Sequence, residues 1–362
     1  MNILAIETSC DDTCIAIVKT SYKTRPRFEI LSNIVSSQVK IHRKYGGVYP
    51  TLAKREHQKN LPIVLKRALK ETKKPKIDLL AATIGPGLEP CLWTGVNFAK
   101  DLAKKWGLPI IPVNHIEAHI LANFISEVRS QKLKVKSLFP AICLVVSGGH
   151  TQLILMQDFG KYRIIGETRD DAAGECFDKI ARILGLGYPG GPLIDRKAAK
   201  FRKRDFGKIS AIADFLPKLP RPMIYQKNYD FSFSGLKTAV LYDFRSQPEK
   251  IRKSKKYIQG MSAEVQQAAI DVLIHKTLRA AKDYKVKTII LGGGVAANEE
   301  LRKQFKTACP TLGVKHLNFL VPPKNLCTDN AAMVAATAYF HWILGETKSW
   351  EEIEVNANLR LK

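Results

Sequence analysis

The order of strand and helix patterns repeats once along the chain, and this repeat most constrains what the chain can fold into. The first copy begins with three strand patterns, at residues 3–7, 13–18 and 27–35. It continues with a helix at 52–71, a strand at 79–84, a glycine-rich turn at 85–87 and a helix at 95–105. The order restarts with patterns at residues 140–146, 151–156, 162–167, 172–184, 261–284, 288–291 and 292–294, and a last helix from residue 298. This predicts an α/β protein with a duplicated βββαβα core and two lobes that face a cleft.

The length of 362 residues is sufficient for two lobes that each have a core of their own. We expect an N-terminal lobe at residues 1–139, joined by the C-terminal helix region at residues 330–362, and a C-terminal lobe at residues 140–329. A stretch rich in Lys, Arg and Pro, at about residues 188–256, interrupts the second repeat. We expect it to form a helical insertion that borders the cleft.

The charge of the chain favours a polyanionic partner, and nucleic acid is the first candidate. Lys and Arg outnumber Asp and Glu by 58 to 33, although a generally basic proteome would give the same excess. Seven cysteines without a C-x-x-C motif favour a reduced, cytoplasmic protein. The chain starts with a strand pattern and has no apolar run of membrane-spanning length, so we expect neither a signal peptide nor a membrane span.

Two histidines, His115 and His119, stand four residues apart after the apolar strand pattern 109–113. On a helix this spacing puts both imidazoles on one face, where they can bind one metal ion. The carboxyl end of a strand is also where open α/β sheets place their ligands. Ordinary surface or core histidines are the alternative. Zinc proteases share the spacing but have Glu directly after the first His, and here Ile116 stands there, which argues against proteolysis.

Glycine-rich turns follow strand patterns at residues 85–87, 147–149 and 292–294. Backbone N–H groups in such turns can close around an anion. No turn matches the phosphate loop of P-loop NTPases or the dinucleotide-binding fingerprint. A cleft with such turns suggests a nucleotide held between the lobes.

Polar residues between these turns could hold the ribose or the base of that nucleotide. Asp178 and Asp195 offer carboxylates, and Gly191 would let a planar group pack on the backbone. The alternative is structural: Asp171 would cap a helix, and Asp178 would pair with a nearby basic residue.

Asp329 stands just before an Ala-rich helix pattern at residues 331–342. Either Thr328 or Asp329 could be no more than the N-cap of that helix. In the other interpretation Asp329 completes a set of two histidines and one carboxylate, which suits Fe²⁺ or Zn²⁺ and leaves positions open for substrate.

Several motifs with this content occur together in one order along nearly the whole chain. They are Glu7–Thr13, Tyr45–Pro50, Gly85–Leu88, the His115/His119 segment, Val146–Thr151, Asp170–Pro192, Phe231–Lys237, Gly292–Asn298 and Cys327–Asn330. The set resembles the TsaD family, the bacterial tRNA adenosine threonylcarbamoyltransferases. The resemblance implies an actin-like ATPase (ASKHA) fold and an acyltransferase that moves threonylcarbamoyl from threonylcarbamoyl-AMP to the N6 amine of the adenosine 3′ of the anticodon, in tRNAs reading A-starting codons (t6A formation).

The resemblance also implies roles for individual residues. His115, His119 and Asp329 would bind one divalent metal, Fe²⁺ or Zn²⁺. The substrate-binding residues that it implies are Val145, Val146, Ser147, Gly148 and Gly149 for the activated donor, and Asp178, Gly191, Asp195 and Asn298 for its nucleotide part. Asp12 is our candidate for taking the proton of the attacking amine. The implied partners are tRNA, a TsaB-like subunit and a TsaE-like ATPase.

The chain departs from the family pattern at two places. Asp12 stands where the family often has Glu, and residues 47–51 read Gly-Val-Tyr-Pro-Thr where the family commonly has Gly-Val-Val-Pro-Glu. Two other functions remain as alternatives. An actin-like-fold ATPase or sugar kinase would turn over ATP without tRNA, and a basic nucleic-acid-binding scaffold would bind tRNA regardless of His115 or Asp329.

Overall fold

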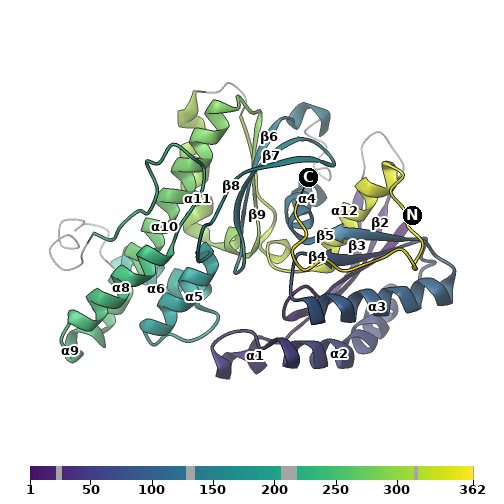
Figure 1. The fold of residues 1–362 in the computed structure, drawn as a ribbon, viewed down its shortest axis with the longest axis horizontal. Coiled ribbons are helices and arrows are strands. Elements are labelled where there is room, and N and C mark those ends of the chain that lie inside the picture. The colour runs from purple at the N-terminus through teal and green to yellow at the C-terminus, as the bar shows by residue number, and fades with distance from the viewer. Residues whose placement is uncertain (22–26, 128–134, 205–217, 314–316, 362) are drawn as a thin grey trace.

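The computed structural model describes residues 1–21, 27–127, 135–204, 218–313 and 317–361, and it has two lobes that are each built on a five-stranded sheet (Figure 1). The strands of the first sheet, in the order β3-β2-β1-β4-β5, are β1 (Asn2–Glu7), β2 (Asp12–Thr20), β3 (Phe28–Ser37), β4 (Leu79–Gly85) and β5 (Ile110–Asn114). Those of the second sheet, in the order β8-β7-β6-β9-β10, are β6 (Ala141–Val146), β7 (Thr151–Asp158), β8 (Lys161–Glu167), β9 (Thr288–Gly292) and β10 (Asn318–Leu320).

The two sheets have the same topology. In each one the first three strands form an antiparallel meander, and the first strand also pairs in parallel with the fourth. The central strand β1 is apolar on both faces, with Ile3, Leu4 and Ala5 completely buried, because helices or the other lobe cover both sides. The predicted α/β fold with a duplicated βββαβα core is therefore confirmed.

Helices cover the outer faces of both sheets and fill the layer between them (Figure 1). The outer helices are α2 (Pro50–Glu71) and α3 (Glu89–Trp106) on the first sheet, and α5 (Ala173–Ile183), α6 (Gly190–Arg204), α8 (Ser234–Ser246), α10 (Lys255–Asp283) and α11 (Glu299–Ala308) in the second lobe. Two helices are short, α1 (Val39–His42) in the first lobe and α9 (Glu249–Arg252) in the second.

Two helices, α4 (His115–Glu127) and α12 (Ala331–Ile343), lie between the sheets. Helix α12 packs on β1, β2 and β5 of the first sheet, while α4 packs on β9 and β6 of the second sheet and on α12 itself. Their side chains share one apolar core with the inner faces of both sheets, and α12 is nearly all apolar because it is buried all round. The inner layer therefore connects the lobes, and it places the ends of α4 and α12 at the cleft.

Some element boundaries differ from the predicted ones. Helix α3 begins at Glu89 rather than at residue 95, because Pro90 sits in its first turn, where a missing N–H costs no hydrogen bond. Helix α10 begins at Lys255 rather than at residue 261, since Ser254 caps it by accepting a hydrogen bond from Tyr257 N–H. Strand β10 has only three residues, too few to show a periodic pattern in the sequence.

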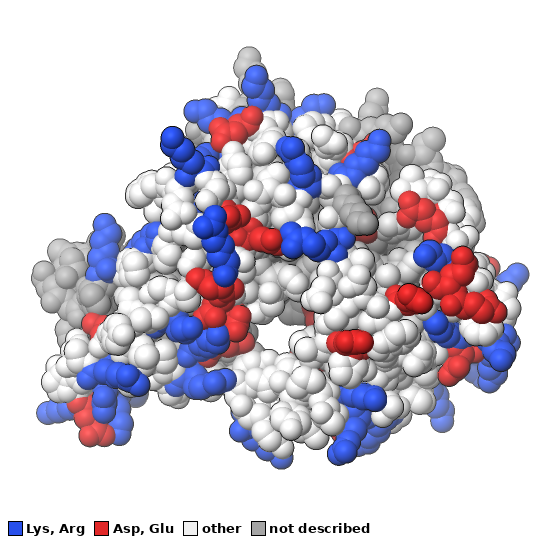
Figure 2. Space-filling model, in the orientation of Figure 1, with Lys and Arg blue, Asp and Glu red and all other residues white. Residues whose placement is uncertain are grey.

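The described part of the basic insertion forms helices α6, α8, α9 and the start of α10, but residues 218–233 are not helical; residues 205–217 lie outside the described part. Figure 2 shows Lys and Arg side chains spread over both lobes and an opening between the lobes. Within the described ranges, no helix is both long enough and apolar enough to cross a bilayer.

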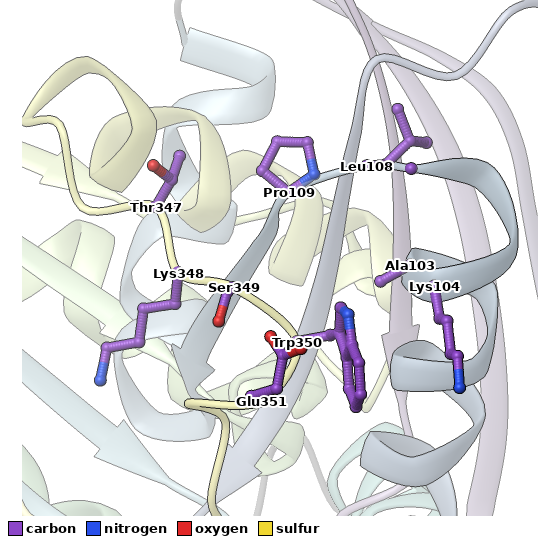
Figure 3. A pocket seen from close by; sticks show the side chains of 10 residues that line it. Ala103, Lys104, Leu108, Pro109, Thr347, Lys348, Ser349, Trp350 and Glu351 are labelled. Atoms are coloured by element: carbon purple, nitrogen blue, oxygen red, sulfur yellow. The ribbon is translucent and has the colours of Figure 1, made fainter.

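A hollow of about 430 Å³ lies between the end of α3, the start of β5 and the segment at residues 347–351 (Figure 3). Trp350 lines it, with the Lys104 ammonium 5.5 Å from the centroid of the Trp350 ring. Lys348 pairs with Ile110 at the first residue of β5, whereas His115 follows the last residue of that strand. The hollow is thus at the opposite end of β5 from the histidine pair.

Candidate active site

The histidine pair lies at the point where β5 ends and α4 begins. The Asn114 side chain caps the helix, because its Oδ1 accepts hydrogen bonds from Ile116 N–H at 2.8 Å and Glu117 N–H at 3.2 Å. His115 and His119 therefore stand on the first two turns of α4, with residue exposures of only 7% and 1%. The predicted position of the pair, at the carboxyl end of a strand and on one helix face, is confirmed.

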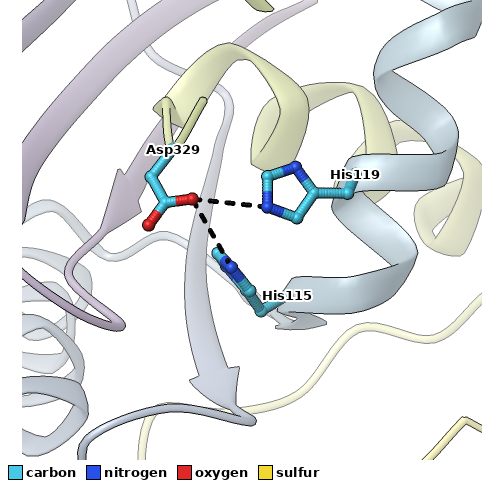
Figure 4. Close-up of side chains that lie close together, drawn as sticks. All are labelled: His115, His119 and Asp329. Carbon is cyan, nitrogen blue, oxygen red and sulfur yellow. Dashed lines mark ion pairs between the residues drawn. The ribbon is translucent and has the colours of Figure 1, made fainter. Parts of the chain in front are cut away.

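Asp329 reaches the same place from the turn before α12 (Figure 4). Its Oδ1 lies 3.6 Å from His115 Nε2 and 3.3 Å from His119 Nε2, and one ligand atom from each residue fits within 4.8 Å of the others. The N-cap of α12 is Asn330, whose side chain accepts a hydrogen bond from Met333 N–H. The alternative that Asp329 or Thr328 only caps this helix is therefore wrong.

This cluster has the chemistry of a metal site. Both ring nitrogens of His119 are buried; Nδ1 makes no hydrogen bond to the described residues, and Nε2 faces the Asp329 carboxylate at 3.3 Å. An unsatisfied imidazole nitrogen is costly inside a protein unless something else takes its lone pair. Two imidazoles and one carboxylate match the donor sets that bind Zn²⁺ or non-haem Fe²⁺ with open positions for substrate. The residues present therefore fit a single divalent metal.

Opposite charges stabilise each other in this cluster. Burial alone would lower the pKa of His115, but the carboxylates of Glu7 and Asp329 raise it to about 9. Burial alone would raise the pKa of Asp329, but His115 and His119 lower it to about 2. For His150, burial and then the two other histidines lower the pKa to about 4, so it stays neutral beside the cluster. A metal must displace the extra proton of His115 to bind there.

Sequence reasoning missed Glu7 as a site residue. It ends the buried strand β1, and its Oε2 accepts hydrogen bonds from Thr83 Oγ1 at 2.7 Å and from His115 Nδ1 at 2.9 Å. The signal was available, because a carboxylate after Ile3–Ile6 in an apolar strand must have buried partners. Which partners these are depends on β4 and α4, which lie far away in the sequence.

Asp12, the candidate for proton transfer, stands at the start of β2 beside this cluster. Burial, followed by the nearby carboxylates of Asp329, Asp11 and Glu7, raises the pKa of Asp12 to about 7. Asp12 Oδ1 is buried and makes no hydrogen bond to the described residues. Such a carboxyl group can lose and accept a proton near neutral pH.

The glycine-rich turns lie at the ends of β4, β6 and β9. In the turn after β6, Gly148 and Gly149 are exposed, whereas the side chains of Val145 and Val146 are completely buried in the core. The two valines can therefore offer only backbone groups to a ligand. The Ser147 carbonyl accepts a hydrogen bond from Gly174 N–H at 3.2 Å, which ties this turn to α5.

The predicted nucleotide-binding residues lie on the helices of the second lobe. Asp178 on α5 accepts hydrogen bonds from the N–H groups of Gly190 at 2.6 Å and Gly191 at 3.3 Å, so it joins the start of α6. Asp195 on α6 accepts a hydrogen bond from Gln266, while Asn298 caps α11 by accepting one from Leu301 N–H. Asp178 thus binds backbone rather than a basic side chain.

Asp171 does not cap α5, because the N-cap position is taken by Ala172 and has no side-chain hydrogen bond. Its carboxylate instead pairs with Lys179 at 2.6 Å and with Lys237 at 2.8 Å, which connects α5 to α8. The capping alternative for Asp171 is therefore wrong.

The lobes also meet at the rim of the cleft, away from the histidines. Arg43 Nε donates a hydrogen bond to the Tyr188 carbonyl at 3.2 Å, and an Arg182 N–H group donates to the Gly46 carbonyl. Arg43 and Gly46 belong to the first lobe, and the other two residues to the second. These contacts bring the segment after α1 next to the turn between α5 and α6.

Comparison with known proteins gives consistent results. The family model described as TsaD, tRNA N6-adenosine threonylcarbamoyltransferase, matches residues 29–336. Proteins with that name from Persephonella marina and Syntrophomonas wolfei are each 45% identical to this chain. The alignments cover 100% and 98% of this chain, respectively, and 96% of each relative. A crystal structure of full-length HypF in the phosphate- and nucleotide-bound form has a TM-score of 0.56 at 13% identity, over 96% of this chain and 47% of that one, which shows likeness of fold alone.

Proposed function

The chain belongs to the TsaD family of tRNA N6-adenosine threonylcarbamoyltransferases, and from that premise we propose how its cleft carries out the transfer. Its fold is the two-lobed α/β fold of the actin-like ATPase superfamily, and the chain is a transferase that acts in tRNA modification. The full-length match to the transferases does not favour a sugar kinase or ATPase.

The reaction that we propose is attack of the adenosine N6 amine on the carbamoyl carbon of threonylcarbamoyl-AMP. The new bond is N–C, the bond that breaks joins that carbon to the phosphate oxygen, and AMP leaves with the electron pair. The amine loses one proton, for which Asp12 is the acceptor, since its carboxyl pKa of about 7 suits exchange at neutral pH. The product is threonylcarbamoyladenosine, t6A.

The observation that carries the metal assignment is the convergence of two buried imidazoles and a carboxylate from α4 and the turn before α12. We propose that His115, His119 and Asp329 hold one Fe²⁺ or Zn²⁺ ion. When bound, the ion supplies a Lewis acid that polarises the donor carbonyl and a template that orients the threonyl group. The protein contributes mainly by holding the two substrates in reacting positions.

We assign the rest of the donor to the second lobe. The backbone of the half-buried Ser147 and of the exposed Gly148 and Gly149, with backbone groups of Val145 and Val146, would bind the activated group. The nucleotide part would lie against Asp178, Gly191, Asp195 and Asn298 on α5, α6 and α11. The net charge of +25 supports binding of tRNA through its phosphates.

The wider arrangement is also a proposal. We assign residues 1–139 and 330–362 to one lobe and residues 140–329 to the other, supported by the packing of α12 on the first sheet. Family membership supports work in the cytoplasm with a TsaB-like subunit and a TsaE-like ATPase.

The test is mass spectrometry of tRNA nucleosides after reaction with threonylcarbamoyl-AMP in a metal-replete assay. We expect t6A with the wild-type protein, none with His119→Ala, and tRNA binding that persists in that variant. His275→Ala is the matched control, because His275 lies exposed on α10. Equal t6A formation by His119→Ala and wild type would reject the metal assignment.

A further inference from the structure

The carboxylate of Glu7 lies next to Nδ1 of His115, the ring nitrogen of this proposed metal ligand that does not face Asp329. It is completely buried at the end of β1, where an ionised group needs several hydrogen-bond donors. Three donors surround it: Ser9 N–H at 2.5 Å on Oε1, and Thr83 Oγ1 at 2.7 Å and His115 Nδ1 at 2.9 Å on Oε2. They come from three different segments of the first lobe, so the carboxylate cannot turn away without losing several bonds at once.

This arrangement selects one tautomer of His115. An ionised carboxylate only accepts hydrogen bonds, so the Nδ1 that faces Glu7 must carry a proton. The Ser9 hydroxyl oxygen, 3.2 Å from the same Nδ1, can share that proton as a second acceptor. In the neutral imidazole the lone pair is then on Nε2, which is the atom that faces Asp329.

His119 has no such support. Its Nδ1 is buried and makes no hydrogen bond to the described residues. The two histidines of the cluster therefore differ, because only His115 is held in orientation and tautomer by a buried carboxylate.

We propose that Glu7 is a positioning residue for the metal centre, which fixes His115 with its proton on Nδ1 and its lone pair on Nε2 toward the metal. The inference rests on the metal site of the proposed function and adds to it a residue that touches neither substrate nor metal. Carboxylates that orient a ligating histidine in this way change metal affinity by about 10- to 100-fold in other proteins.

Glu7→Gln tests the proposal with little change in shape. A glutamine in this place has one acceptor oxygen and one donor NH₂ group. If the oxygen stays on Ser9 N–H, the NH₂ group faces His115 Nδ1 and favours the opposite tautomer, with a proton on Nε2 that blocks the metal. If the oxygen stays on His115, the NH₂ group faces the Ser9 N–H, and two donors then oppose each other.

The matched control is Glu117→Gln on the same helix as the ligands. Glu117 is also buried and also accepts a hydrogen bond from a histidine, His341 Nε2 at 2.7 Å, but that histidine is not near Asp329 in the cluster. The measurement is the dissociation constant of Zn²⁺ for the full chain by competition with a chelator, with circular dichroism to verify folding. We expect about 10- to 100-fold weaker binding for Glu7→Gln and unchanged binding for Glu117→Gln.

Equal Zn²⁺ affinity of Glu7→Gln and wild type would overturn the role of Glu7 and leave the metal site standing. Failure of the wild type to bind about one Zn²⁺ would instead overturn the metal site, and this inference with it. If Glu7→Gln does not fold, ¹⁵N NMR of histidine in the Zn²⁺-loaded wild type decides. A proton on His115 Nδ1 supports the proposal, and a proton on Nε2 overturns it.

Discussion

The pairing of His341 with Glu117 makes the stability of the inner helix layer depend on pH. His341 Nε2 on α12 lies 2.7 Å from Glu117 Oε2 on α4, and its Nδ1 pairs with Glu346. Tyr162 from β8 donates a further hydrogen bond to Glu117 at 2.8 Å. Both histidine nitrogens can donate only when the ring is protonated. Burial alone would lower the pKa of His341, but Glu117 and then Glu346 raise it to about 9.

The size of the effect follows from this pKa. The His341 side chain is only 17% exposed, so solvent screens the pair little. At about 1.4 kcal/mol per pKa unit, a rise from 6.5 to about 9 stabilises the folded state by about 3 kcal/mol. Because the folded pKa is the higher one, this stabilisation is fully present below pH 6.5 and is lost as the pH rises through about 9. Over the 362 residues of the chain, whose two sheets share the core of the inner layer, such a loss lowers the melting temperature by roughly 4 °C.

The assay compares thermal unfolding of wild type and His341→Gln between pH 6 and pH 10. The difference in melting temperature between the two proteins cancels the contributions of the titratable groups that they share. We expect a difference of several degrees at pH 6 that shrinks as the pH approaches 10. Glu346→Gln is the control, because this carboxylate is 56% exposed and its loss should cost less than about 1 kcal/mol. A difference that stays constant with pH, or an NMR titration of His341 near 6.5, would refute the reasoning.

Two further predictions concern the cleft. Asp12→Asn should lower the rate of t6A formation by about 100-fold. It should also remove the rise of the rate with pH around pH 7, because only the ionised Asp12 carboxylate accepts a proton. Rates of the variant that match those of the wild type from pH 6 to 8.5 would contradict this. Gly293→Ala should lower the melting temperature and impair donor binding, since Gly293 has a φ of +88° and an added Cβ would lie 2.3 Å from the Val146 carbonyl oxygen. Gly294→Ala is its control, with nothing within 4 Å of an added Cβ, and an equal effect of both variants would show that steric crowding is not the cause.

Most of the fold could be predicted from the sequence because strands and helices leave local patterns. The buried strands β1, β4, β6 and β9 read as short apolar runs, and the repeated order of elements alone implied two similar sheets. Element ends were less predictable, since they depend on single contacts. The start of α10, for example, is set by the cap at Ser254, which lies in a run of Lys and Ser that carries no apolar pattern.

The site was predictable where its geometry is local. The spacing of His115 and His119 on one helix already brings the two rings together. For Asp329 the sequence allowed either capping or ligation, because Thr328, Asp329 and Asn330 are all good caps. Only the folded chain decides, by using Asn330 as the cap.

The proposed metal ligands all belong to the layer between the sheets, and this has a consequence for motion of the lobes. Two ligands are on α4, the third precedes α12, and these helices pack on each other. Buried polar pairs fix the arrangement further, with Glu7 on His115 and Glu117 on His341. The contacts of Arg43 and Arg182 that join the lobes at the rim involve none of these residues. We therefore expect that breaking the rim contacts leaves the mutual geometry of the three ligands unchanged.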